Sequence, residues 1–134
     1  MKYILCLVLL VDALAMSAIA AAPKRDADAE QLGTMAGLAL ACGSQKKLED
    51  FELISSRLIA NEAPTEKEEL EQVRIYTEAK WAAMQRQKRH KVVSCREILD
   101  RFNDLPIFGS TVYKDGSVLL PDGVWSRPLR PVKR

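Results

Sequence analysis

The sequence has 134 residues and a formal net charge of +2, from 20 lysines and arginines against 18 aspartates and glutamates. This near balance gives no electrostatic basis for general nucleic-acid binding. Charged residues are mixed with regularly spaced apolar ones, which argues against a disordered chain. The length is that of one small domain.

Residues 1–20 have the pattern of a cleavable export signal. A basic start at Lys2 precedes an apolar run from Tyr3 to Ile19, and Ala18-Ile19-Ala20 is a small-residue cleavage motif. The alternative is a retained membrane anchor, but the run is short and Asp12 within it is costly in a bilayer. We therefore expect a periplasmic or secreted protein that begins at residue 21 and has no membrane-spanning segment.

The mature chain keeps two cysteines, Cys42 and Cys95. An even pair in an exported protein favours a disulfide, which would stabilise so small a domain by about 4 kcal/mol in the chain-entropy model. Two buried thiols or a redox pair are the alternatives. No Cys-x-x-Cys motif supports the redox alternative.

The first predicted helix starts near Asp26 or Asp28, either of which can cap it, and stops at Gly43. Its apolar stripe consists of Leu32, Met35, Ala36, Ala39 and Cys42. Gly33 and Gly37 give the helix a second, nearly smooth face, where another backbone can approach closely. We expect this helix to be the centre of the core.

Two longer helices follow. The second is predicted from residue 44 or 45 to Glu62, with Leu48, Phe51, Leu58 and Ile59 on one face. The third is predicted from Glu66 to about Arg89, after a capping box formed by Thr65 and Glu68. Its predicted buried arc contains Leu70, Val73, Thr77, Trp81 and Met84.

A fourth, short helix is predicted after a second capping box, Ser94 with Glu97, and is ended by Pro106. Its apolar stripe places Cys95 inward, as Cys42 is on the first helix. These positions suit a bridge between the two helices.

The C-terminal region has the pattern of strands and turns instead of helices. Asp115-Gly116 between two apolar runs predicts a hairpin with a two-residue turn, pairing Tyr113 with Val118 and Val112 with Leu119. Pro121-Asp-Gly123 is a second turn. We therefore expect a helical domain at 21–109, a hairpin and turn at 110–125 packed on it, and a basic, proline-containing tail at 126–134.

Few residues of the sequence are candidates for catalysis. The single histidine, His90, lies among cations, and the glutamates near residues 66–71 suit a helix N-terminus. No phosphate loop, dinucleotide fingerprint or calcium loop is present. We expect no cofactor and no metal.

Two cationic or apolar segments are candidates for partner binding. The first is the end of the third helix, with Lys88, Arg89 and Lys91, which could contact an acidic protein or an anionic surface. Such a turn is also common without any ligand. The second is the tail with Trp125, Arg127, Leu129 and Arg130. Trp125 either pins the hairpin to the helices or is offered to a partner.

The expected fold is thus mainly α, a small four-helix bundle with a C-terminal hairpin and one inter-helix disulfide. Its plan resembles periplasmic chaperones and secretion-system pilotins in architecture alone, which does not fix a function. The sequence favours a non-enzymatic binding or accessory protein of an envelope or secretion assembly, whose partner is another exported protein. The alternatives are a periplasmic stress chaperone and an enzyme of unrecognised type.

Overall fold

The computed structural model describes residues 25–131. The predicted signal at 1–20 and the last three residues of the tail lie outside this range. Four helices come first: α1 (Arg25–Ala41), α2 (Lys46–Glu62), α3 (Glu66–His90) and α4 (Cys95–Asn103). A 3-10 helix, η2 (Pro106–Gly109), leads to a small antiparallel sheet with the strand order β1 (Thr111–Val112), β2 (Val118–Leu119) and β3 (Trp125–Ser126). The predicted mainly helical fold is confirmed.

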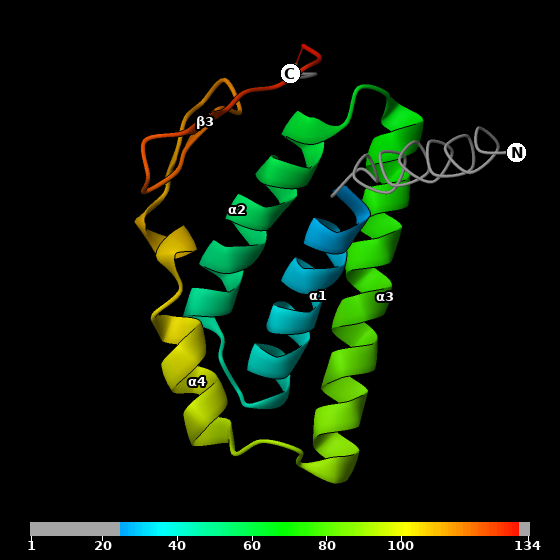
Figure 1. Ribbon diagram of the computed structural model, residues 1–134, viewed down its shortest axis with the longest axis vertical. Helices are drawn as coiled ribbons and strands as arrows, with labels where there is room; N and C mark the ends of the chain where they lie inside the picture. The colour runs from blue at the N-terminus through cyan, green and yellow to red at the C-terminus, as the bar shows by residue number, and fades with distance from the viewer. Residues whose placement is uncertain (1–24, 132–134) are drawn as a thin grey trace, which may run out of the picture.

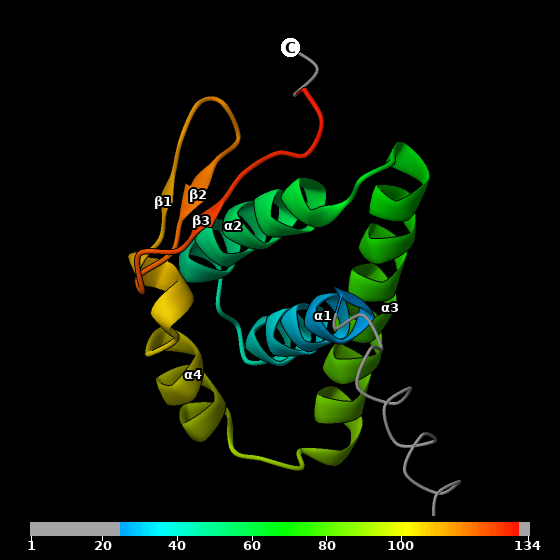
Figure 2. The same cartoon turned by 45° about the horizontal axis from the view of Figure 1, so that its top comes forward.

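Helix α1 lies at the centre, with α2, α3 and α4 around it (Figures 1 and 2). It packs most extensively along α3, and the two helices run parallel. A Cβ atom at Gly33 or Gly37 would overlap the carbonyl oxygen of Tyr76 or Lys80, respectively. The predicted close approach of another backbone to the glycine face is therefore confirmed, and that backbone is α3.

The core lies between α1, α2 and α4. Ala36 and Ala39 are fully buried in α1, as is Phe51 in α2. The ring of Phe51 contacts Phe102 of α4 at 5.2 Å between centroids, and Phe108 of η2 packs edge-on against Phe102 at 5.4 Å. The three phenylalanines of the chain therefore form one cluster, which joins the first half of the fold to the second.

Local signals fix most helix ends. The amide of Glu68 donates to Thr65 Oγ1 at 3.2 Å, and that of Glu97 donates to Ser94 Oγ at 3.3 Å. Both predicted N-caps are thus confirmed. The prediction for the start of α1 was wrong, because the helix extends to Arg25 and Asp28 lies inside it. Helix α4 ends at Asn103, and Pro106 starts η2 instead of ending α4 directly.

The disulfide joins Cys42 to Cys95 with a Cα–Cα distance of 5.2 Å. It connects the chain just after α1 with the first residue of α4. The residue Cys95 is exposed, so its predicted inward position was wrong. The buried face of α4 is made by Ile98 and Phe102, further along the helix.

The hairpin register also differs from the prediction. Val112 pairs with Val118, and Thr111 pairs with Leu119. The loop therefore has three residues, closed by the Tyr113 N–H donating to the Ser117 carbonyl at 2.9 Å. Asp115 Oδ1 accepts the Ser117 amide, and Gly116 has a φ of 88°. A residue in the left-handed region after a tight turn is typical of three-residue hairpin loops.

The second predicted turn repeats this design. The Leu120 N–H donates to the Val124 carbonyl at 2.9 Å, Asp122 Oδ1 accepts the Val124 amide, and Gly123 has a φ of 84°. The turn brings Trp125 opposite Leu119. It therefore adds the third strand to the predicted hairpin.

Candidate protein-binding surfaces

An aromatic patch lies on the C-terminal sheet. It consists of Tyr113, Trp125 and Arg127. The rings of Tyr113 and Trp125 are 5.2 Å apart between centroids, and the Arg127 guanidinium lies 5.4 Å from the Trp125 ring centroid. Trp125 is still 44% exposed. The patch therefore presents an indole that its neighbours hold in place but do not cover.

Asn61 fixes this sheet to the helices. Its buried side-chain amide, near the end of α2, donates to the Gly116 carbonyl at 3.0 Å and to both the carbonyl and the hydroxyl of Ser126. Val118 on β2 is fully buried. The sheet is thus attached through Asn61 and Val118, while the ring of Trp125 contacts Tyr113 and Arg127 within the sheet region. The sequence signal that could have found this anchor is a polar asparagine among the mostly apolar buried positions of α2.

The tail runs from the sheet to the start of α3. Arg130 forms a partly buried ion pair with Glu69 and donates to the Ala63 carbonyl at 3.2 Å. Leu129, by contrast, is 61% exposed. Of the predicted tail residues, Arg130 is therefore engaged within the chain, whereas Leu129 and Arg127 lie at the surface.

The basic end of α3 lies at the other end of the molecule from the tail (Figure 1). Lys88, Arg89 and Lys91 are all exposed there. Below them, Gln87 is buried and donates to the Val93 carbonyl at 2.6 Å, which holds the turn into α4. The predicted tail and helix-end residues therefore form two separate surfaces.

An apolar stripe along α3 lies at the surface, although it was predicted to be buried. The stripe consists of Leu70, Val73, Thr77 and Trp81, which were predicted to be buried together with Met84. Only Met84 is buried; Leu70 is 64% exposed and Trp81 is 61% exposed. The prediction was wrong because α1 packs against a different face of α3, the one that carries Tyr76, Ala79 and Ala83.

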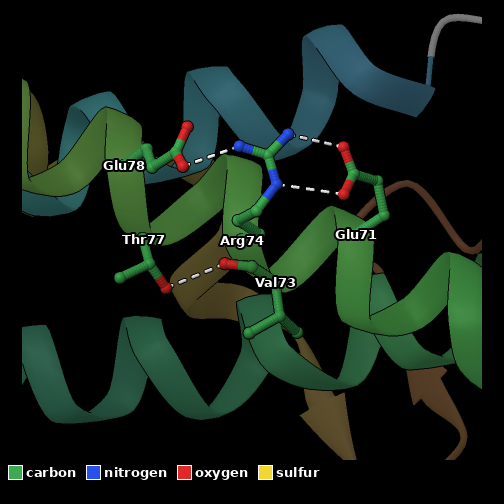
Figure 3. Close-up of polar contacts among 5 residues, drawn as sticks. All are labelled: Glu71, Val73, Arg74, Thr77 and Glu78. Atoms are coloured by element: carbon green, nitrogen blue, oxygen red, sulfur yellow. Dashed lines mark hydrogen bonds and ion pairs between the residues drawn. The ribbon is translucent and has the colours of Figure 1, made fainter.

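Charged residues border this stripe. Arg74 forms ion pairs with Glu71 and Glu78 at 2.6 Å each, and the hydrogen bond from Arg74 holds the pKa of Glu71 below its usual range. Val73 and Thr77 point away from this cluster (Figure 3). The Thr77 hydroxyl donates to the Val73 carbonyl at 2.8 Å, so it is satisfied by its own helix.

A cleft of about 550 Å³ opens between α1, the end of α2 and the start of α3. Its wall is apolar, with Ala29, Leu32, Met35, Leu58, Ile59 and Ala63. Its lining also includes the acidic residues Asp28, Glu62, Glu68 and Glu71. The size suits a small ligand, and the acidic lining would favour a cationic or apolar group over an anion.

Perturbed titrating groups lie apart from one another. Burial, aided by the charge of Glu52, raises the pKa of the Tyr76 hydroxyl, which faces the interior between helices. The Ser117 amide lowers the pKa of Asp115 in the hairpin loop. Within residues 25–131, no group of three or more His, Cys, Asp or Glu side chains is arranged to hold a metal ion. Over the same range, no helix has the length and apolar character needed to cross a bilayer.

Comparison with known proteins gives no relative. No family description, curated protein or solved structure matches this chain.

Proposed function

We propose that this chain is a non-enzymatic exported protein, periplasmic or secreted, that binds another exported protein as an accessory of an envelope or secretion assembly. The aromatic patch is the observation that supports it. The Cys42–Cys95 bridge is consistent with an oxidising, exported compartment.

The chemistry of the patch suits protein recognition. Tryptophan, tyrosine and arginine are the residues enriched at the energetic centres of protein interfaces. Trp125 contacts both Tyr113 and Arg127, so a partner would immobilise few additional rotamers on binding. The exposed guanidinium of Arg127 favours a partner surface that combines apolar and acidic residues.

The backbone under the patch is also fixed. Trp125 lies on the edge strand β3, whose Ser126 accepts hydrogen bonds from Asn61 of α2. The patch therefore keeps its shape in the free protein, which favours affinity through preorganisation.

Photo-crosslinking in cells that export the full chain tests this function. A photoreactive residue at Val124, which is 55% exposed beside the patch, should capture a partner identifiable by mass spectrometry. Trp125→Ala and Arg127→Ala should each reduce the yield by about tenfold or more, as expected for an interface centre. Trp81→Ala is the matched control, because it removes the other exposed indole and should leave this product unchanged.

Two results would contradict the proposal. The first is a crosslinked product whose yield is the same in the Trp125→Ala and Arg127→Ala variants as in the wild-type chain. The second is the absence of any heterologous product at Val124 while the exported protein is present at its normal level.

A further inference from the structure

The α3 stripe has the geometry of a helix-pairing surface. Its members recur at intervals of three and four residues, which places Leu70, Val73, Thr77 and Trp81 on one face of the helix. This face is exposed along more than two turns, although most large apolar residues of α2 and α4 are covered. No described segment of the chain buries it.

The charges at the two ends of α3 favour a second copy of this helix in the antiparallel orientation. The first turn carries Glu66, Glu68 and Glu69, and the last turn carries Lys88, Arg89 and His90. A second α3 laid parallel would oppose acid to acid and base to base. A second α3 laid antiparallel would oppose the acidic start of each helix to the basic end of the other.

The same stripe is self-complementary about Thr77. If a two-fold axis passes beside this residue, positions four before and four after it face each other. Val73 then lies opposite Trp81 of the second copy, and Trp81 opposite the second Val73. Along the stripe's border, Arg74 lies within one turn of Glu78 of the second copy. A small residue at the axis lets two helices approach closely between the larger contacts.

We propose that two copies of this chain form a dimer with two-fold symmetry by packing their α3 stripes antiparallel, with Thr77 at the axis. An isologous interface of this kind uses one patch on both subunits. It leaves the aromatic patch on the C-terminal sheet available, so the dimer and the proposed partner binding use different surfaces.

Sedimentation velocity of the exported, disulfide-bonded protein tests the association. The wild-type chain should sediment as a dimer at concentrations on the order of 10 µM and above. Val73→Ser and Trp81→Ser should each raise the dissociation constant by about tenfold or more. Val92→Ser is the matched control, because Val92 is 68% exposed but lies outside the stripe. Circular dichroism shows whether each variant keeps its helices.

Cysteine crosslinking tests the orientation. With Thr77→Cys, the two introduced thiols meet at the axis and should form an intermolecular disulfide. With Leu70→Cys, the two thiols would be about 21 Å apart in an antiparallel pair, too far to bridge. A parallel pair would instead crosslink at both positions.

Three outcomes would overturn the proposal. One is a monomer at all concentrations tested. Another is a dimer that forms equally well with Trp81→Ser and wild type. The third is crosslinking of Leu70→Cys as readily as Thr77→Cys. A monomer that suppresses aggregation of unfolded clients through Trp81 would assign the stripe to chaperone activity. Each result is independent of whether Trp125 binds a partner.

Discussion

The two faces of α3 differ in a way that reverses the usual expectation for an amphipathic helix. The face that packs on α1 carries Tyr76, Ala79, Lys80 and Ala83. The face that carries Leu70, Val73 and Trp81 is exposed. Apart from Met84, the more apolar face is therefore not the one used in the fold.

The reason lies in the opposing helix. At Gly33 and Gly37, α1 presents bare backbone, and the closest contacts come from the carbonyl groups of Tyr76 and Lys80. Backbones can approach this closely only where side chains are small or directed aside. Lys80 meets this condition because its ammonium reaches Glu52 of α2, where both side chains are partly buried. Size complementarity, rather than hydrophobicity, thus decides which face of α3 is buried.

Replacing both glycines tests the packed face and should have the largest effect. Gly33→Ala with Gly37→Ala should lower the free energy of unfolding by about 3 kcal/mol, because each new methyl group overlaps a carbonyl of α3. Alanine is a better helix former than glycine by up to about 1 kcal/mol per site. A net loss of stability would therefore come from the overlap with α3. Urea unfolding followed by circular dichroism measures the change.

Thr34→Ala is the control for this double variant. Thr34 is exposed on the same helix, and its replacement also raises helix propensity. Its stability should equal or slightly exceed that of the wild type. If the double glycine variant were as stable as Thr34→Ala, the close approach of α1 and α3 would contribute nothing.

Much of the fold could be predicted from local signals. Capping residues, proline and the regular spacing of apolar residues predicted four helices, and the ends of α2 and α3 were placed within one or two residues. The pair of cysteines that remains once the predicted signal is removed predicted the bridge. These features depend on residues close in sequence or on simple counting, and so needed no tertiary information.

The face of α3 and the candidate sites could not be predicted in the same way. Periodicity shows that Leu70, Val73 and Trp81 share a face, but not what covers it. The available signal was the pair Ala79 and Ala83, one turn apart, which matches the spacing of Gly33 and Gly37. Tyr113 was missed as a patch residue because its contact with Trp125 depends on the second turn and on the three-residue loop.

Tyr76→Phe probes the packed face more finely, with a smaller effect. The buried Tyr76 hydroxyl has no hydrogen-bond partner among the described residues. Removing it should raise the free energy of unfolding by about 1 kcal/mol, because an unsatisfied polar group costs free energy when buried. Tyr113→Phe, which removes a hydroxyl from an exposed residue, should change stability less.

Tyr76→Phe should also change how the free energy of unfolding depends on pH in alkaline solution. Burial raises the pKa of Tyr76 in the folded state above the value of about 10 found in unfolded chains. Above that pH the unfolded state binds fewer protons, so the wild type loses stability as pH rises. Tyr76→Phe should show a shallower loss than wild type. Equal slopes in the two proteins would place the Tyr76 hydroxyl in water.

Substitution on the exposed face should have the smallest effect on folding. Leu70→Gln should change the free energy of unfolding by no more than about 0.5 kcal/mol, because the side chain is already 64% exposed. The measurement belongs at a protein concentration where the chain is monomeric, since association adds stability by mass action. Met84→Gln is the matched comparison: it lies on the same predicted arc but is buried, and should cost about 2 kcal/mol. Equal losses for the two variants would mean that the α3 stripe is covered within the monomer. A loss for Met84→Gln alone would separate the apolar residues that fold the chain from those left for association.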